Sequence, residues 1–464
     1  MIRRALYILC LCLLFAKGVG AQTGNESEVY EIYWSQVIRL LQSRGLPENE
    51  IERIMSVFRT NDIRSDEKLA SVLGGLYPAG KGILFIFYQF SNDTLRRVTA
   101  EPGKIVEVSR FPVTRAGLLQ LGSDFNHVLG LYKTAGKRMP VKRGGVIKPP
   151  PPSAGLNYDT LVQRATKLLL PAAFSRDWRH IVIIPSLNLG TLPFYLLRPF
   201  ADSTELIDHC SYSVAPGIGD LVALRMKVLK KAASFWNGEF NEVPFDKNRD
   251  LNWLDTWPMV LQHTLFVSNP EYPTNTNYDF PDLPGAEREV QDAIPMAGSF
   301  DLLRGKTAQK ETVLHLIGKA DLAYFATHGV ASEEDPMNKS FLVLSGRNPF
   351  LTAKDIIDSR SSISKFPSMV ILSACQTGLG KSMEAGVAGL ARSFMLAGSE
   401  HVVMSLWNVD DNATAYLMNR FMFYLKQPSA FTPSEPMRKA MLDTRKKFPR
   451  ASQWAGFTVF GVVY

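Results

Sequence analysis

The sequence predicts an α/β protein with a mostly parallel central sheet that is covered by helices on both faces. Short, almost continuously apolar runs recur along the chain, and segments with helical periodicity lie between several of them. Strands buried on both faces show no polar side, and parallel strands need a crossover that is usually a helix. The composition, 46% hydrophobic and 21% charged over 464 residues, is that of a globular chain with a large core.

Residues 22–79 are predicted to form a short helical segment. Between Glu31 and Gln42 the apolar residues lean to one side, and Gly45 ends this run; a second apolar run follows Pro47. The segment is too short for a solenoid, which needs three or more repeats. It can therefore serve as a helical pro-segment or as half of a helical repeat.

The strands follow from β-branched and aromatic runs, and the helices from a 3.6-residue apolar period. The predicted strands are 83–87 with 104–108 as its neighbour, then 180–184, 265–267, 322–327, 369–373 and 401–406, with 341–344 as a short edge and 457–460 closing the sheet. The predicted helices are 312–319, 384–396 closed by Gly398, 413–425 and 436–446.

A basic and proline-rich loop interrupts this pattern at residues 133–153. It contains Lys142, Arg143 and the run Pro149 to Pro152. Four successive prolines preclude regular helix or sheet, so we expect an extended, exposed segment that a trypsin-like activity would cut.

The N-terminal residues predict export. Arg3 and Arg4 precede an apolar run from Ala5 to Ala16, and small residues follow up to Ala21. This is the pattern of a secretory signal peptide over residues 1–21, and the apolar run is too short to span a bilayer. The mature protein is therefore predicted to be periplasmic or secreted and not membrane-spanning.

Cleavage after Ala21 would leave two cysteines, Cys210 and Cys375. Two cysteines in an oxidising compartment invite a disulfide, but the surroundings of Cys375 predict a free thiol. Loss of three basic residues with the signal would lower the net charge from +8 to about +5. The remaining charge forms no basic stripe, which argues against nucleic-acid binding.

Two predicted strand ends carry the residues with chemistry, His328 followed by Gly329, and Cys375. Active sites of open parallel sheets collect at the carboxyl ends of strands, and neighbouring strands lie about 4.8 Å apart. An imidazole there can take the thiol proton, and the backbone N–H groups of Gly329 and Cys375 can form an oxyanion hole. The 47-residue separation is close to the spacing of caspases. Taken singly, a strand-end histidine or cysteine is structural more often than catalytic.

These motifs resemble the CHAT domains, relatives of caspases and separases among the clan CD cysteine peptidases. The resemblance covers roughly residues 80–464. It is carried by the motifs His180–Pro185, Leu192–Phe194, Leu283–Val290, Ala326–Gly329, Leu372–Gly378, Gly389–Arg392 with Ala397–Gly398, Ser405–Asp411 and Trp454–Phe457. It implies a caspase-like α/β/α sandwich, with His328 and Cys375 as the dyad. Many relatives carry tetratricopeptide repeats, of which this chain has at most the short helical segment.

By similarity to separases, Asp411, or Asp410 beside it, would bind a basic P1 side chain; the alternative is that these aspartates cap the helix near Ala413. Ser373 stands where some basic-specific relatives have an acid. We find no metal-ligand spacing among the histidines and no complete phosphate loop, so no metal or cofactor is expected.

The sequence thus predicts an exported cysteine endopeptidase acting on protein or peptide substrates, made as a latent precursor until the helical segment or the basic loop is cut. The rival hypothesis is a catalytically silent scaffold that binds a protein partner through its cleft or N-terminal helices. A peptide ligase or transpeptidase would share the same acyl-enzyme.

Overall fold

The computed structural model describes residues 26–42, 48, 51–52, 63–131, 141–142, 151–239, 261–274, 276–332, 335, 337–373, 382–383, 386–387, 389–407, 410–427 and 432–461. Residues 1–25, which include the predicted signal peptide, and the 374–380 segment, which includes Cys375, lie outside this description. Among the described residues, no helix is both long enough and apolar enough to cross a membrane.

One large sheet runs through the molecule, and eleven strands belong to it in the described part of the chain. Their spatial order is β3 (Lys104–Pro112), β2 (Thr94–Glu101), β1 (Ile83–Ser91), β5 (His180–Ile184), β6 (Ser211–Val214), β18 (Phe457–Gly461), β17 (His401–Ser405), β14 (Met369–Leu372), β10 (Leu322–Ala326), β7 (His263–Pro270) and β9 (Ser299–Gly305). Seven of the ten pairings are parallel, and β3–β2, β2–β1 and β18–β17 are antiparallel. The predicted mostly parallel sheet is confirmed.

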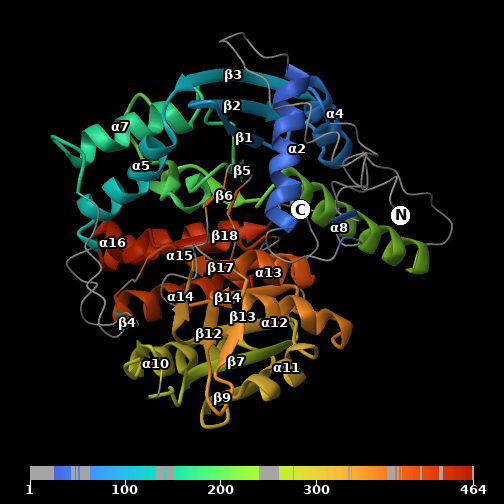
Figure 1. Ribbon diagram of the computed structural model, residues 1–464, viewed down its shortest axis with the longest axis vertical. Helices are drawn as coiled ribbons and strands as arrows, with labels where there is room; N and C mark the ends of the chain where they lie inside the picture. The colour runs from blue at the N-terminus through green and yellow to red at the C-terminus, as the bar shows by residue number, and fades with distance from the viewer. Residues whose placement is uncertain are drawn as a thin grey trace, which may run out of the picture.

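Helices cover both faces of this sheet (Figure 1). On one face lie α5 (Arg115–Val128), α7 (Tyr158–Leu169), α10 (Pro284–Ala293), α14 (Asp411–Leu425), α15 (Ser434–Lys447) and α16 (Ala451–Trp454). On the other lie α2 (Glu26–Gln42), α4 (Asp66–Leu76), α8 (Ile218–Glu239), α11 (Lys310–Ile317), α12 (Ala353–Asp358) and α13 (Leu390–Ala397). The structure is therefore the α/β/α sandwich that the sequence predicts.

Smaller sheets lie beside the main one. β11 (Gly329–Val330), β12 (Phe341–Val343) and β13 (Phe350–Thr352) form a three-stranded antiparallel sheet. β15 (Ser382–Met383) pairs with β16 (Gly386–Val387), and β4 (Val141–Lys142) pairs with β8 (Tyr278–Asp279).

Several details of the sequence prediction are wrong. Residues 104–108 lie in β3, the edge strand, and the neighbour of β1 is the missed β2. Residues 341–344 were expected at an edge, whereas β12 is the central strand of the small sheet. β18 does not close the main sheet but lies between β6 and β17. A local run of apolar residues predicts a strand but not its partners, because pairing is set by distant segments.

The helix predicted over residues 384–396 begins only at Leu390. Gly389 has φ 152° and ψ −163°, a conformation outside the helical region that glycine tolerates. Part of the residues before it form the β15–β16 pair instead.

The N-terminal helix α2 is part of the core. Tyr30, Tyr33 and Val37 are buried, and both tyrosine rings contact Phe87 of β1, with centroids 6.1 and 5.0 Å away. The Tyr30 hydroxyl donates to Asp66 at 2.9 Å, and Asp66 also binds Arg96 of β2. Helix α2 is therefore joined to the sheet by apolar contacts and by a buried ion-pair network.

Candidate active site

Two adjacent parallel strands lead to the predicted site. In the pairing of β10 with β14, Leu322 lies opposite Met369 and Phe325 lies opposite Leu372. Both strands therefore end at the same edge of the sheet. His328 follows β10 by two residues, and the described part of the chain after β14 ends at Ser373. Because Cys375 lies outside the described residues, its pairing with His328 stays a prediction.

The His328 ring is buried and held in one tautomer. Its Nε2–H donates to the Pro281 carbonyl oxygen at 2.7 Å. Because a carbonyl can only accept, Nε2 carries the proton, and Nδ1 of the neutral ring keeps its lone pair. Nδ1 has no hydrogen-bond partner among the residues described. Burial lowers the pKa of His328 below 6.5, opposed by the bond to Pro281. At neutral pH the ring is therefore an uncharged base that can accept a proton at Nδ1.

Neighbouring groups fix this ring. Tyr272 and Phe280 pack against it with ring centroids 4.7 and 5.6 Å from that of the imidazole. The Thr327 hydroxyl donates to the Val343 carbonyl at 2.6 Å, and the Val343 N–H donates to the His328 carbonyl at 2.9 Å. Strand β12 thereby fixes the backbone of His328, while the segment before α10 fixes its side chain.

The same hydrogen-bond pattern sets the direction of the Gly329 N–H. Gly329 lies opposite Leu342 in the antiparallel β11–β12 pair. Because the Val343 N–H bonds to the His328 carbonyl, Gly329 and Leu342 form a non-hydrogen-bonded pair, whose own N–H groups point away from the partner strand. The Gly329 N–H is thus not used by β12.

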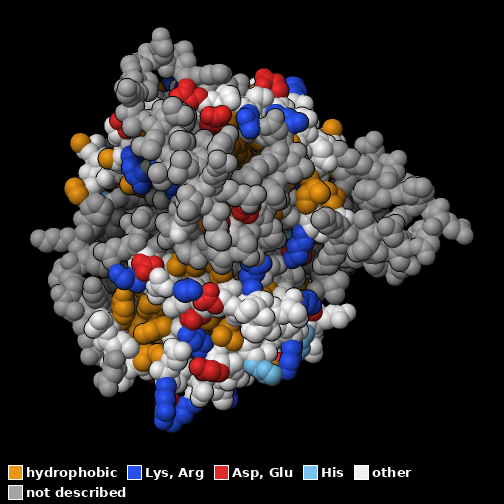
Figure 2. Space-filling model, turned by 45° about the vertical axis from the view of Figure 1, so that its right-hand side comes forward, with side chains coloured by type: hydrophobic (Ala, Val, Ile, Leu, Met, Phe, Trp, Pro, Cys, Tyr) orange, Lys and Arg blue, Asp and Glu red, His pale blue; other side chains and the backbone are white. Residues whose placement is uncertain are grey.

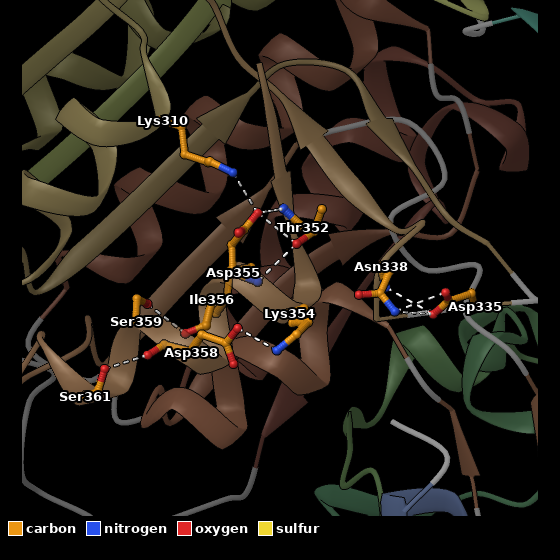
Figure 3. Close-up of polar contacts among 10 residues, drawn as sticks. All are labelled: Lys310, Asp335, Asn338, Thr352, Lys354, Asp355, Ile356, Asp358, Ser359 and Ser361. Carbon is orange, nitrogen blue, oxygen red and sulfur yellow. Dashed lines mark hydrogen bonds and ion pairs between the residues drawn. The ribbon is translucent and has the colours of Figure 1, made fainter. Parts of the chain in front are cut away.

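A lysine anchors the small sheet from behind (Figure 3). Lys310 of α11 is mostly buried; its Nζ donates to the Phe350 carbonyl at 3.1 Å and pairs with the Asp355 carboxylate at 2.9 Å. Asp355 also completes a capping box with Thr352 at the start of α12. These bonds tie β13 to α11 and α12, and so support β12, which holds His328.

The surroundings of His328 are apolar. Beside it lies a second hydrophobic cluster made of Tyr272, Phe280, Leu283, Phe341 and Val343. Tyr278, Val330 and Phe350 pack against this cluster and are only half-buried. Figure 2 shows apolar side chains gathered on the lower half of the molecule, at the height at which Figure 1 places α10 and β12. Such surroundings keep water away from the imidazole, which strengthens electrostatic interactions there.

The basic loop reaches this side of the molecule. Only 141–142 and 151–153 of residues 133–153 are described, and Val141 and Lys142 pair antiparallel with Asp279 and Tyr278. The expectation of no sheet in this segment is thus wrong at these two residues, which precede the prolines. The paired segment ends two residues before Pro281, the partner of His328.

The two aspartates proposed for P1 binding have different environments. Asp410 is exposed and caps α14, accepting from the N–H groups of Asn412 and Ala413 at 3.1 and 3.2 Å. Asp411 is half-buried and lies against Gly285 of α10, where an added Cβ would fall 2.4 Å from its Oδ2. The capping alternative therefore holds for Asp410, and the P1 role of Asp411 stays a prediction.

Cys210 is a free thiol and forms no disulfide. It is fully buried, its Sγ–H donates to the Trp178 carbonyl at 2.9 Å, and burial raises its pKa to about 12. This thiol is structural and unreactive, as buried cysteines usually are.

Sequence reasoning missed two groups near the site. The Pro281 carbonyl is a backbone acceptor, so no residue type could have revealed it. Glu289 was quoted only as part of a motif; it is buried on α10 and accepts a hydrogen bond from the Tyr324 hydroxyl of β10. Its position on the apolar side of α10, beside Val290 and Ala293, was the available signal.

The model of the CHAT domain matches residues 158–462, about two thirds of the chain. The chain belongs to the CHAT domain family, as its motifs indicated.

Two curated relatives are named Tetratricopeptide repeat protein 28. The mouse protein is 22% identical over 411 residues, and the human protein 21% over 415 residues. The alignments cover 80% and 81% of this chain but only 16% and 15% of the relatives' own length.

Among solved structures, the chain is similar to separase in the separase–securin complex of Saccharomyces cerevisiae, with a TM-score of 0.48 and 12% identity, over 85% of this chain and 31% of that one. It is also similar to gingipain R, an Arg-specific cysteine proteinase, with a TM-score of 0.39 and 10% identity, over 75% and 74% of the two chains.

Proposed function

We propose that this protein is an exported cysteine endopeptidase with His328 as its base and Cys375 as its nucleophile. The observation that carries the proposal is the strand register. Partners in β10 and β14 lie 47 residues apart along the chain, as in Leu322 and Met369. His328 and Cys375 are separated by the same 47 residues. A continuation of this register beyond the strand ends would bring the two side chains to the same level of the sheet.

The chemistry follows from the state of His328. Nδ1 accepts the proton of the Cys375 thiol, and the thiolate attacks the carbonyl carbon of the scissile peptide bond. The N–H groups of Gly329 and Cys375 donate to the resulting oxyanion. Collapse of this intermediate breaks the C–N bond, the imidazolium gives its proton to the leaving amine, and a thioester remains. A water molecule that loses a proton to Nδ1 then hydrolyses the thioester and regenerates the thiol.

A thiol-reactive peptide probe tests this proposal. Purified mature protein should be labelled at Cys375, and labelling should be lost in Cys375→Ala and in His328→Ala with the fold unchanged. Cys210→Ser is the matched control. Because the buried Cys210 thiol should not react with the probe, the Cys210→Ser protein should be labelled to the same extent as the wild type. Absence of labelling under every activation condition would favour the rival, a silent scaffold that binds a partner.

We also propose a preference for Arg or Lys at P1, with Asp411 as the acid. The support is the position of Asp411 at the start of α14, next to α10 and near Glu289. Fluorogenic peptides that differ only at P1 test this preference. Equal cleavage of peptides with neutral P1 residues would contradict it.

Product analysis with an added amine acceptor separates hydrolysis from transpeptidation.

Latency belongs to the same proposal, and the basic loop is its better-supported device. Its strand β4 pairs with β8, which ends two residues before Pro281, the hydrogen-bond partner of His328. Helix α2 is built into the core, so its removal would damage the fold. Intact-mass analysis of an active preparation decides the matter, since a fully active uncut chain would exclude latency.

Export is proposed from the signal-peptide pattern of residues 1–21. N-terminal sequencing of protein recovered from the periplasm or the medium of producing cells should give a chain that begins at Gln22. Recovery only from the cytosol, with Met1 retained, would refute export.

A further inference from the structure

A buried carboxylate lies under the candidate site. The Glu289 side chain on α10 is almost completely inaccessible, with the residue 4% exposed. It accepts hydrogen bonds from the Tyr324 hydroxyl and from the Ser373 side chain. Among the described residues it forms no ion pair with a lysine or arginine. Buried carboxylates normally have a cationic partner, so the role of this one requires an explanation.

The two hydroxyl donors come from the two strands that lead to the dyad. Tyr324 of β10 lies opposite Ile371 of β14, and side chains two residues apart on a strand share a face. Ser373 therefore projects to the same side as Tyr324, which is the side covered by α10. Tyr324 precedes His328 by four residues, and Ser373 precedes Cys375 by two. One carboxylate thus bonds to both strands just before their predicted catalytic residues.

The charge of this carboxylate changes when the pH is varied around neutrality. The pKa of Glu289 is raised to about 7, mainly by burial and to a smaller extent by the charge of Asp411 on α14, while the bonds from Ser373 and Tyr324 act in the opposite direction. In the part of the chain that the structure describes, those three residues are the polar groups that influence its charge from β14, β10 and α14. On its own helix, Glu287 points elsewhere and pairs with Arg304 at the surface, at 3.2 Å.

We propose that Glu289 is a positioning residue, which holds the ends of β10 and β14 together through Tyr324 and Ser373 and so sets the approach of His328 to Cys375. The inference rests on the proposed peptidase function. The ionised carboxylate accepts from both hydroxyls, and hydrogen bonds to a charged acceptor are stronger than neutral ones. A protonated carboxyl group must itself donate, which disturbs one of the two bonds. Reactivity of Cys375 should therefore rise as Glu289 loses its proton.

The test is the pH dependence of Cys375 alkylation by iodoacetamide, quantified by peptide mapping, together with kcat/KM on a peptide. Alkylation by this small reagent needs no peptidase activity. In the wild type, the rate should show an ionisation near pH 7 in addition to that of the dyad. Glu289→Gln should abolish that ionisation and lower the rate about tenfold at pH 8, equivalent to ~1.4 kcal/mol. Glu287→Gln, two residues away on the same helix, should leave the profile unchanged.

Two further variants keep the test decisive if Glu289→Gln does not fold. Tyr324→Phe and Ser373→Ala each remove one hydroxyl donor. Each variant should therefore show a smaller increase in the Cys375 alkylation rate near pH 7 than the wild type. Combined with Glu289→Gln, neither should add a further loss. An alkylation profile that stays identical to that of the wild type in both single variants would overturn the inference, and so would additive losses in the combined variants.

Other outcomes separate this inference from the function on which it rests. If Glu289→Gln keeps the wild-type alkylation profile, Glu289 is not a positioning residue. If only substrates with basic P1 residues are affected, Glu289 binds substrate and the inference is equally overturned. If His328→Ala leaves Cys375 alkylation unchanged, the dyad itself is refuted.

Discussion

The buried ion pair between Asp66 and Arg96 gives a quantitative test of how α2 and α4 are attached to the sheet. The two side chains are 8% and 5% exposed, and Arg96 also donates to Gln89 at 2.6 Å. The other carboxylate oxygen of Asp66 accepts from the Tyr30 hydroxyl of α2 at 2.9 Å. The substitution Asp66→Ala removes the acceptor of both bonds.

The expected cost is large because a cation stays behind. Removing one partner of a buried pair typically costs ~3–5 kcal/mol, since the remaining charge loses its compensation inside the protein. The Tyr30 hydroxyl loses its acceptor as well, which adds about 1 kcal/mol. We therefore expect Asp66→Ala to lower the free energy of unfolding by about 4–6 kcal/mol.

Urea unfolding followed by fluorescence measures this difference. The matched control is Asp358→Ala, which removes an ion pair with Lys354 at 2.6 Å whose side chains are 59% and 52% exposed (Figure 3). Such exposed helical pairs contribute only ~0.3–0.5 kcal/mol. A loss below about 1 kcal/mol in Asp66→Ala, indistinguishable from the control, would refute the argument that this network ties α2 to the core.

Three other predictions concern the core and the site. A chain that begins at Ile63 lacks the buried Tyr30, Tyr33 and Val37, whose burial contributes ~1.5–3 kcal/mol each, so it should unfold at a far lower urea concentration. Unchanged stability would instead support the hypothesis that this helical segment is a removable pro-segment. Gly285→Ala would place a Cβ 2.4 Å from Asp411 Oδ2 and should cost ~1–3 kcal/mol, whereas Gly75→Ala, with no atom within 4 Å, should stabilise α4 slightly; equal effects would contradict the packing of α10 on α14. Burial lowers the pKa of His180 to about 3. Between pH 6.5 and about 3, the His180 ring is therefore protonated in the unfolded chain but neutral in the folded chain. As pH is lowered from about 6.5, the free energy of unfolding should therefore decrease by up to ~1.4 kcal/mol per pH unit. The difference in urea midpoint between the wild type and His180→Asn, which lacks this ionisable group, should become smaller over the same pH range. A difference that stays constant would contradict this prediction.

The sequence alone was sufficient for the class of fold and for the family. Runs such as His180–Ile184 and Leu322–Ala326 are buried along their whole length, so they show no alternation of polar and apolar residues, and their mainly apolar character is visible without coordinates. The CHAT motifs were readable for a related reason, since a histidine and a cysteine at strand ends, flanked by small residues, depend on the local chain.

Pairing and environment were decided by the tertiary structure. The missed strand β2 has the sequence Thr-Leu-Arg-Arg-Val-Thr-Ala-Glu, and its two arginines made it look like an exposed segment. Arg96 and Arg97 are buried only because they pair with Asp66 of α4 and with Glu107 of β3. The tautomer of His328 depends on the carbonyl of Pro281, 47 residues away, and the buried state of Glu289 depends on hydroxyls from β10 and β14. A sequence specifies which groups are present, but the burial and hydrogen bonding that set their protonation arise only when distant segments pack together.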